Sequence, residues 1–244
     1  MLDQKTAPPA DDFRHKMRRI LDRICLEPGA AEAFLTEDTV WDVAHPVNQL
    51  VGPGAVISEY LEPLRSGLEH LERRDLMFIG GENRLPNGGR WVAAITHYVG
   101  NFTKPLFGLS PSGSMVFLRS GEFYRIDEDG RIAEAKILFD LLDLMRQIRR
   151  MPLPSIGDEI TFPAPATQDG LCPAAPYDGD AFDIVERMMK TLGEYTPGTF
   201  DSKGQTGKDG VWADNMLWYG PGGIGSNFRW SGFIQDHRAP FLIA

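Results

Sequence analysis

A carboxylic acid stands where a strand-like run of residues gives way to a helix-like run. Asp140 follows the apolar residues 137–139 and precedes Leu141 and Leu142, so apolar side chains flank it on both sides. A carboxyl group in an apolar cavity has a raised pKa and can exchange a proton near neutral pH, as general acid–base catalysis requires. An Asp at the start of a helix can instead cap its first turn. The sequence therefore leaves two roles open for Asp140, a proton-transfer group or an N-cap.

Two of the five histidines occur among apolar residues. His45 follows Trp41 by four positions and precedes Pro46, and His97 lies in the middle of the strand-like run 89–102. Strand alternation places His97 on the same face as Trp91 and Ile95. An imidazole on an apolar face needs a polar partner. Each histidine is therefore either a core residue with a satisfied partner or part of the lining of a ligand cavity.

A possible ion pair lies in the strand-like run 113–127. Arg119 and Glu122 are three positions apart, and strict alternation would place them on opposite faces of the sheet. A bulge at Gly121 would bring both side chains to one face, which is a common use of glycine in a strand. The alternative is that they take part in ion pairs at the surface, which contribute little to stability.

The sequence lacks the motifs of the common cofactor and metal enzymes. It contains no GxGxxG, GxxxxGK[ST], HExxH, GxSxG or CxxC pattern, and its histidines show no spacing typical of metal ligands. Its two cysteines, Cys25 and Cys172, cannot form a four-cysteine zinc site. We therefore expect neither a metal ion nor an organic cofactor.

Composition excludes several classes of protein. The chain has 244 residues, 42% of them hydrophobic, and a formal net charge of −9. An acidic chain is a poor binder of nucleic acid or of an anionic membrane. No run approaches the ~18 apolar residues of a membrane span, and the N-terminus has no secretory signal. These features predict a soluble, cytoplasmic protein that binds neither nucleic acid nor a membrane.

Hydrophobic periodicity predicts the elements that position these residues. Apolar side chains recur at helical spacing over residues 11–25, and shorter helices are expected at 30–35, 54–66 and 140–149. Four strand-like runs, 76–81, 89–102, 113–127 and 130–140, are separated by turn signals. Consecutive strands joined by short turns form an antiparallel meander.

The last third of the chain has a different organisation. We assign residues 1–150 to one domain, 151–180 to a Pro-rich crossover, and 181–244 to a partial second unit. A faint internal repeat supports the last assignment, because a helix followed by Val-Trp and Gly-Pro occurs near both Phe13 and Phe182. The second copy ends before the residues that would build its sheet.

These residues, taken in order, resemble the SnoaL-like polyketide cyclases of the nuclear-transport-factor-2-like (NTF2-like) superfamily. The likeness rests on the helices followed by Trp41-x-x-x-His45-Pro46 and by Gly52-Pro53, and on the runs 121–125, 129–132 and 139–140. It is greatest to the long "predicted ester cyclase" members that carry two such units.

The resemblance implies an α+β fold, in which a cone-shaped, curved antiparallel sheet wraps around helices and encloses an apolar cavity. Family cyclases close a ring by intramolecular aldol condensation without a metal or an organic cofactor. In this sequence the resemblance assigns the catalytic role to Asp140, His97 and His45. It assigns substrate binding to the following residues: Trp41, Arg119, Glu122, Trp91 and Tyr124. It also implies a homodimer and a small apolar or aromatic substrate.

Two further functions are compatible with the same fold. One is a non-catalytic module that binds a small ligand or mediates dimerisation. The other is an epoxide hydrolase, which would need an Asp–Arg–Asp arrangement to hold a water molecule, and the sequence shows no convincing second Asp on the required face.

Overall fold

The computed structural model describes residues 12–83, 88–152, 154, 170–171, 180–201 and 210–243. These residues divide into two compact units. The first contains the described residues up to Arg150 together with Gly170 and Leu171, and the second contains the other described residues from Met151 onwards. None of the described helices is long and apolar enough to cross a bilayer.

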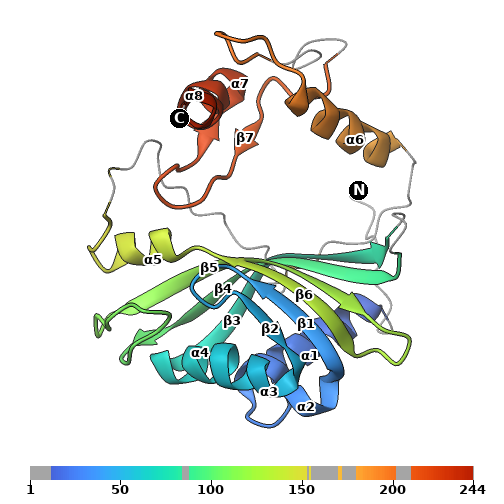
Figure 1. Cartoon of the computed structure of the whole chain (residues 1–244), viewed down its shortest axis with the longest axis vertical. Helices are drawn as coiled ribbons and strands as arrows, with labels where there is room; N and C mark the ends of the chain where they lie inside the picture. The colour runs from blue at the N-terminus through green and yellow to red at the C-terminus, as the bar shows by residue number, and fades with distance from the viewer. Residues whose placement is uncertain are drawn as a thin grey trace, which may run out of the picture. The chain divides into compact units, whose positions relative to one another are not determined.

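The first unit is built on a curved six-stranded sheet in the order β2-β1-β6-β5-β4-β3 (Figure 1). Its strands are β1 (Leu35–Val43), β2 (Gln49–Val51), β3 (Leu68–Glu82), β4 (Arg90–Phe102), β5 (Met115–Ile126) and β6 (Ile132–Phe139). Strands β3 to β6 form the predicted antiparallel meander. The sheet as a whole is mixed, because β1 pairs in parallel with β6.

Helices cover one face of this sheet (Figure 1). They are α1 (Phe13–Leu26), α2 (Ala31–Phe34) and a continuous helical stretch made of α3 (Gly52–Val56), η1 (Ile57–Leu61) and α4 (Glu62–Gly67). The apolar stripe of α1 is buried, and the Asp12 side chain caps the helix by accepting a hydrogen bond from the backbone N–H of Arg14 at 3.0 Å. We call the helix-covered face of the sheet the inner face and the opposite one the outer face.

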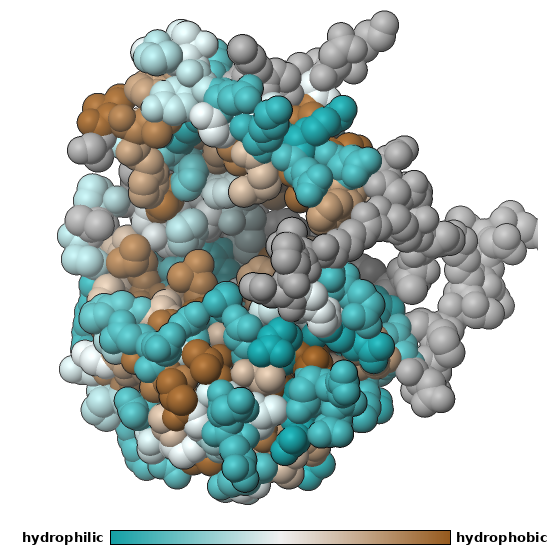
Figure 2. All heavy atoms as spheres, turned by 45° about the vertical axis from the view of Figure 1, so that its right-hand side comes forward, coloured by the Kyte–Doolittle hydropathy of each residue, from teal (hydrophilic) through white to brown (hydrophobic). Residues whose placement is uncertain are grey.

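Strand alternation is regular where it positions the candidate residues. Along β4, Val92, Ala94, Thr96 and Tyr98 are buried on the inner face, and the side chains between them are half-buried on the outer face. The ladder between β4 and β5 runs without a register shift, so Gly121 is not a bulge. Apolar side chains also reach the surface of the molecule (Figure 2), and on the outer face Phe123 and Leu138 are exposed.

The predicted α+β class and most of the predicted elements are confirmed. Three differences concern strands. Strand β3 begins at Leu68 rather than near residue 76, and neither β1 nor β2 is among the predicted strands. The first half of β3 reads as charged surface because Arg73 and Asp75 occupy inner-face positions, where apolar residues would be expected.

The described part of the second unit consists mainly of helices. It contains α6 (Asp180–Gly193), a two-stranded ladder of β7 (Leu217–Trp218) and β8 (Asn227–Phe228), and then α7 (Arg229–Gly232), η2 (Phe233–Arg238) and α8 (Ala239–Ile243). Its core is aromatic, with Trp230 and Phe233 buried and Trp212 and Trp218 packed against Phe233. The unit is a partial one, as predicted.

The predicted crossover at 151–180 lies mostly outside the described residues, but two of its members, Gly170 and Leu171, belong to the first unit and pack against β3. The carbonyl of Gly170 accepts a hydrogen bond from the backbone N–H of Phe78 in β3 at 2.8 Å. Leu171 forms a parallel bridge with Phe78 and is buried in the same hydrophobic core. Leu171 thus completes a core whose other members lie before residue 150.

Replacing Gly170 by Ala is expected to destabilise the first unit. Gly170 has φ +69°, and a Cβ atom there would lie 2.8 Å from the backbone carbon of Met77 and 2.9 Å from the nitrogen of Phe78. The left-handed conformation costs an alanine about 1–2 kcal/mol, and the overlap with immovable backbone adds to this cost. Thermal unfolding followed by circular dichroism should show a fall in Tm of more than about 4 °C.

Gly29 provides the matched control, because it has φ +82° and open space where a Cβ would be placed. The Gly29→Ala variant should show only the conformational cost. Equal losses of Tm in the two variants would mean that the contact between Gly170 and β3 adds nothing to stability.

Candidate functional site

The structure separates the predicted site residues into three groups. Trp41, Glu122 and Tyr124 lie buried on the inner face. Trp91, His97 and Arg119 lie on the outer face, and Asp140 pairs with Arg119 there. His45 lies in the turn after β1. The residues that the resemblance assigned to one cavity therefore do not form one site.

The inner-face group centres on Glu122, whose side chain is completely buried. Its carboxylate accepts hydrogen bonds from the Tyr98 hydroxyl at 2.6 Å, from the Tyr124 hydroxyl at 2.8 Å and from Nη1 of Arg73 at 2.6 Å. Charge-assisted hydrogen bonds of this length are the strong ones. They compensate for the removal of the Glu122 charge from water.

Arg73 extends the network to a second carboxylate. Its Nη2 lies 2.9 Å from Oδ1 of Asp75, two residues along the same strand, and its side chain is 1% exposed. The other oxygen of Asp75 lies 3.1 Å from Nε of Arg18 on α1. A guanidinium group therefore lies between two buried carboxylates. We call Arg73, Asp75, Tyr98, Glu122 and Tyr124 the buried polar cluster.

The ionisation states in this cluster follow from burial and charge. Burial, reinforced by the negative charge of Glu122, raises the pKa values of Tyr98 and Tyr124 well above the ordinary tyrosine value. Both hydroxyls thus stay protonated and serve as hydrogen-bond donors. Burial acts against the charge of Arg73, but Glu122 and Asp75 outweigh it and raise the pKa of Arg73, which remains a cation.

The cluster has unused hydrogen-bonding capacity. Nε and Nη2 of Arg73 and both carboxylate oxygens of Asp75 have no aligned hydrogen-bond partner among the described residues, although their charges lie within ion-pair distance. Buried polar atoms in native proteins are nearly always satisfied by protein or by water. Two donor nitrogens of Arg73 and the carboxylate of Asp75 therefore lack an aligned hydrogen-bond partner among the described residues, although all of them are buried.

Aromatic rings pack beside the cluster. The Trp41 ring lies 5.7 Å from the Tyr124 ring and 5.8 Å from the Tyr60 ring, measured between centroids, and all three side chains are buried. The Trp41 indole N–H donates to Thr39 Oγ1 at 3.2 Å. These rings belong to the hydrophobic core and pack directly next to the buried polar cluster.

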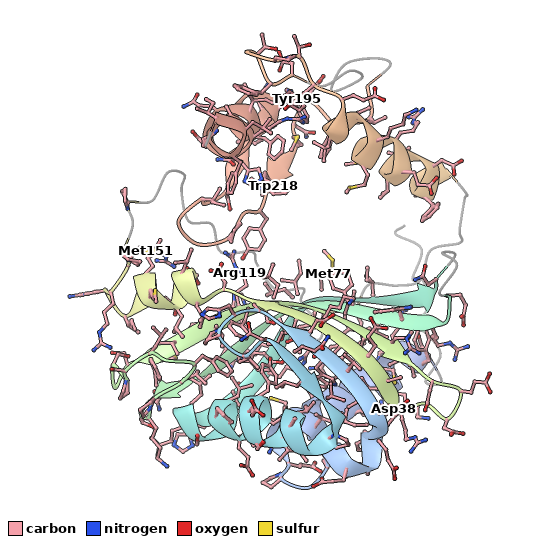
Figure 3. The ribbon with its side chains drawn as sticks, in the orientation of Figure 1. Asp38, Met77, Arg119, Met151, Tyr195 and Trp218 are labelled. Atoms are coloured by element: carbon pink, nitrogen blue, oxygen red, sulfur yellow. The ribbon has the colours of Figure 1, made fainter. Side chains whose placement is uncertain are left out.

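Asp140 occupies the capping position that the sequence left open for it. It precedes α5 (Leu141–Gln147), and its Oδ1 accepts the backbone N–H of Asp143 at 2.9 Å. Its Oδ2 lies 2.6 Å from Nη2 of Arg119. Asp140 is therefore paired with a cation instead of standing alone in an apolar cavity. Figure 3 shows Arg119 on the outer face, as it does Met77 of β3.

His97 and Arg119 are neighbours across the β4–β5 ladder on this face. The His97 ring packs edge-on against Phe117, with the centroids 6.0 Å apart. Burial and the positive charge of Arg119 lower the pKa of His97, and the more weakly acting Asp143 opposes them. His97 is therefore a neutral imidazole near pH 7.

The free energy of unfolding is expected to decrease as the pH is lowered, because of His97. Since the pKa of His97 is lower in the folded state, the unfolded chain binds more protons as the pH drops below about 6.5, the ordinary histidine value. Denaturant titrations of the His97→Gln variant at pH 7 and pH 5 should show a smaller loss of unfolding free energy than the wild type. The same replacement at His45 controls for the loss of a histidine. An identical pH dependence in the wild type and His97→Gln would contradict the prediction.

The structure decides two placements that the sequence left open. His45 is exposed in the turn between β1 and β2, where the chain reverses before β2 pairs with β1, so it is not a core residue. Arg119 and Glu122 lie on opposite faces, because regular alternation continues through Gly121.

Sequence reasoning missed Arg73, Asp75 and Tyr98. The spacing carried no usable signal, because strict alternation from Phe78 would place Arg73 and Asp75 on the outer face, and only the register shift between Asp75 and Met77 brings them to the inner face. Charged residues at such positions are normally taken as surface. Only the burial of their partner, Glu122, identifies them as interior.

Among the described residues, no three His, Cys, Asp or Glu side chains are grouped as a metal ion would require.

The central part of the chain is similar to a known protein family. Residues 75–148 match the model of the SnoaL-like polyketide cyclase family. This segment covers most of β3 and all of β4, β5, β6 and α5. The predicted resemblance is therefore confirmed for these residues. The sequence matches no curated protein.

Solved structures similar to this chain include proposed polyketide cyclases. One, a proposed SnoaL-like polyketide cyclase from Jannaschia sp. CCS1, is 18% identical, covers 60% of this chain and 99% of its own, and has a TM-score of 0.44. IdmH, a proposed polyketide cyclase from Streptomyces antibioticus, is 12% identical, covers 57% and 99%, and has a TM-score of 0.47. TsrD from Streptomyces laurentii is 17% identical, covers 57% and 98%, and has a TM-score of 0.47.

Proposed function

We propose, from the family match of residues 75–148 and the geometry of the inner face, that the protein is a cofactor-independent acid–base enzyme that acts on a small apolar carbonyl compound, with the buried polar cluster as its reaction centre. The observation that carries this proposal is the placement of Arg73 between Asp75 and Glu122. The outer-face residues His97, Arg119 and Asp140 are not part of this centre.

Asp75 is the base in this proposal. Its two carboxylate oxygens lie near the guanidinium groups of Arg73 and Arg18 but accept no aligned hydrogen bond from a described residue. Lone pairs on its oxygens are therefore available for a proton. Glu122, in contrast, already accepts three hydrogen bonds and acts to hold Arg73 and the two tyrosines in position.

Arg73 supplies the stabilisation of negative charge. Glu122 fixes its Nη1, while its Nε and Nη2 have no aligned acceptor among the described residues. Such preorganised donors are worth most where charge develops in a buried site. An oxyanion formed next to Asp75 would accept these two N–H groups.

The resulting step is a proton transfer followed by bond formation. Asp75 removes a proton from the carbon next to a carbonyl group, and the enolate oxygen accepts hydrogen bonds from Arg73. The enolate carbon forms a bond to a second carbonyl carbon of the same molecule. The new alkoxide then takes back the proton held by Asp75. This sequence describes an intramolecular aldol closure. If Asp75 instead returned its proton to a different atom of the enolate, the reaction would be an isomerisation.

Epoxide hydrolysis is a second candidate, favoured by the same geometry. This chemistry calls for a guanidinium group between two carboxylates, which Asp75, Arg73 and Glu122 provide. Asp75 would take a proton from water while the water oxygen bonds to one epoxide carbon and the carbon–oxygen bond breaks. The alkoxide would accept hydrogen bonds from Arg73 and then receive the proton from Asp75.

Two assays with the whole chain test the proposal. In D2O, 2-acetonaphthone should lose its methyl proton signals faster in the presence of protein if the centre is a base for carbon acids. In water enriched in oxygen-18, styrene oxide should give labelled diol if the centre hydrolyses epoxides. Acceleration of neither reaction would favour a non-catalytic binding module and contradict the proposal.

A further inference from the structure

Three polar residues form a row across the inner face of the sheet. Asp75 on β3 is in register with Thr96 on β4, and Thr96 is in register with Ser120 on β5. All three residues are completely buried. In-register side chains on neighbouring strands have Cβ atoms about 4.5–5.5 Å apart. The three side chains can thus contact one small molecule placed over Thr96.

None of the polar side-chain atoms in this row has an aligned hydrogen-bond partner among the described residues. The atoms are Oδ1 and Oδ2 of Asp75, Oγ1 of Thr96 and Oγ of Ser120. Leaving one such atom unsatisfied in a protein interior costs about as much as a hydrogen bond contributes. A group of adjacent unsatisfied atoms is the usual mark of a buried water site or a ligand site.

We propose that Asp75, Thr96 and Ser120 form an internal binding site for a single hydroxyl group, which is a water molecule in the free protein and a hydroxyl of the ligand when one is bound. A hydroxyl donates one hydrogen bond, which Asp75 accepts, and its oxygen accepts two, which Thr96 and Ser120 donate. A hydroxyl group can thus form a hydrogen bond with each of the three side chains. A methyl group in the same place would leave all three side chains unsatisfied.

This inference rests on the proposed function only in placing the base, Asp75, at one end of the row. It adds a preference that the proposed function does not contain. A hydroxyl held by the row lies directly beside Asp75, so the centre would select ligands that present a hydroxyl group next to the carbon or oxygen that reacts.

Thermal unfolding of Thr96→Val, Ser120→Ala and the double variant tests for the bound water without any substrate. With water in the row, each substitution removes one of its hydrogen bonds, and Tm should fall by about 2–4 °C per hydroxyl lost. Without water, the hydroxyls are unsatisfied, and their removal should leave Tm unchanged or raise it. The latter result would overturn the inference.

Thr36 provides a matched control. It is a buried threonine on β1 whose Oγ1 also lacks a partner among the described residues, and it lies outside the row. Thr36→Val should leave Tm unchanged or raise it. If Thr36→Val lowers Tm as much as Thr96→Val does, the fall reflects the loss of any buried threonine hydroxyl, and the inference fails.

Two ligands of similar shape test whether the row binds only water or also binds a hydroxyl group of a ligand. Benzyl alcohol and toluene have almost the same shape, so their effects on Tm compare a hydroxyl with a methyl group. The wild type should be stabilised more by benzyl alcohol, and the Thr96→Val/Ser120→Ala variant should lose that preference. Equal stabilisation of the wild type by the two probes would overturn the ligand part. Because no arm measures turnover, failure here is distinct from failure of the proposed activity.

Discussion

Replacing Arg73 by Leu is expected to destabilise the first unit by about 3–5 kcal/mol, enough to unfold it at 37 °C in many proteins of this size. The substitution leaves the carboxylates of Glu122 and Asp75 buried without the cation that lies 2.6 Å and 2.9 Å from them. The two tyrosine hydroxyls cannot replace a full positive charge. Urea denaturation followed by tryptophan fluorescence measures the loss.

Two variants control this experiment. Arg74 follows Arg73 in the same strand but pairs with Glu72 at the surface, with both side chains more than half exposed. Arg74→Leu should therefore change stability little, because exposed ion pairs contribute little. The triple variant Arg73→Leu/Asp75→Asn/Glu122→Gln should recover much of the loss, because no buried charge is left unpaired. Equal effects of Arg73→Leu and Arg74→Leu would show that the buried polar cluster is not what stabilises the unit.

Replacing Asp75 by Asn is expected to reduce turnover by roughly 10²–10⁴-fold, the usual contribution of a general base. Asparagine has the shape of aspartate but cannot accept the proton. The measurement is the initial rate of whichever reaction the wild type accelerates, proton exchange of 2-acetonaphthone or hydrolysis of styrene oxide. Unchanged near-ultraviolet circular dichroism would show that the variant keeps its fold.

Asp140→Asn is the matched variant on the outer face. It makes the same chemical change at the carboxylate that caps α5 and pairs with Arg119. Its turnover should stay close to that of the wild type. The opposite pattern, with Asp140→Asn inactive and Asp75→Asn active, would return the reaction centre to the residue that the sequence alone favours.

Local signals in the sequence predicted much of this fold. Helix α1 follows from its apolar stripe and its Asp cap, and the meander of β3 to β6 follows from turn signals between apolar runs. Glu122, Tyr124 and Trp41 are among the site residues that the sequence predicts, and all three are buried on the inner face. The inferences about α1 and the meander needed only neighbouring residues, whereas Trp41 and Tyr124 are candidates because of the family resemblance.

The rest depends on partners that are distant in sequence. Arg73 and Glu122 are on different strands, and only their contact at 2.6 Å shows that Arg73 faces the interior while other charged residues of β3 are exposed. Asp140 shows the reverse case. Its apolar neighbours suggested an isolated carboxyl group, but Arg119, which lies on the adjacent strand, occupies the space beside it. Periodicity predicts which residues share a face, but it does not predict which charged groups form ion pairs there.

The parallel pairing of β1 with β6 has a consequence for synthesis of the protein in the cell. Val43 ends β1 and Phe139 ends β6, so 139 minus 43, or 96, residues must be translated before the partner of β1 is complete. At 5–20 residues per second the nascent chain waits roughly 5–20 s. During that time one edge of β1 can pair with β2, while the edge meant for β6 remains without its partner. During this interval, the unpaired edge of β1 leaves the nascent chain most accessible to chaperones and most prone to aggregation.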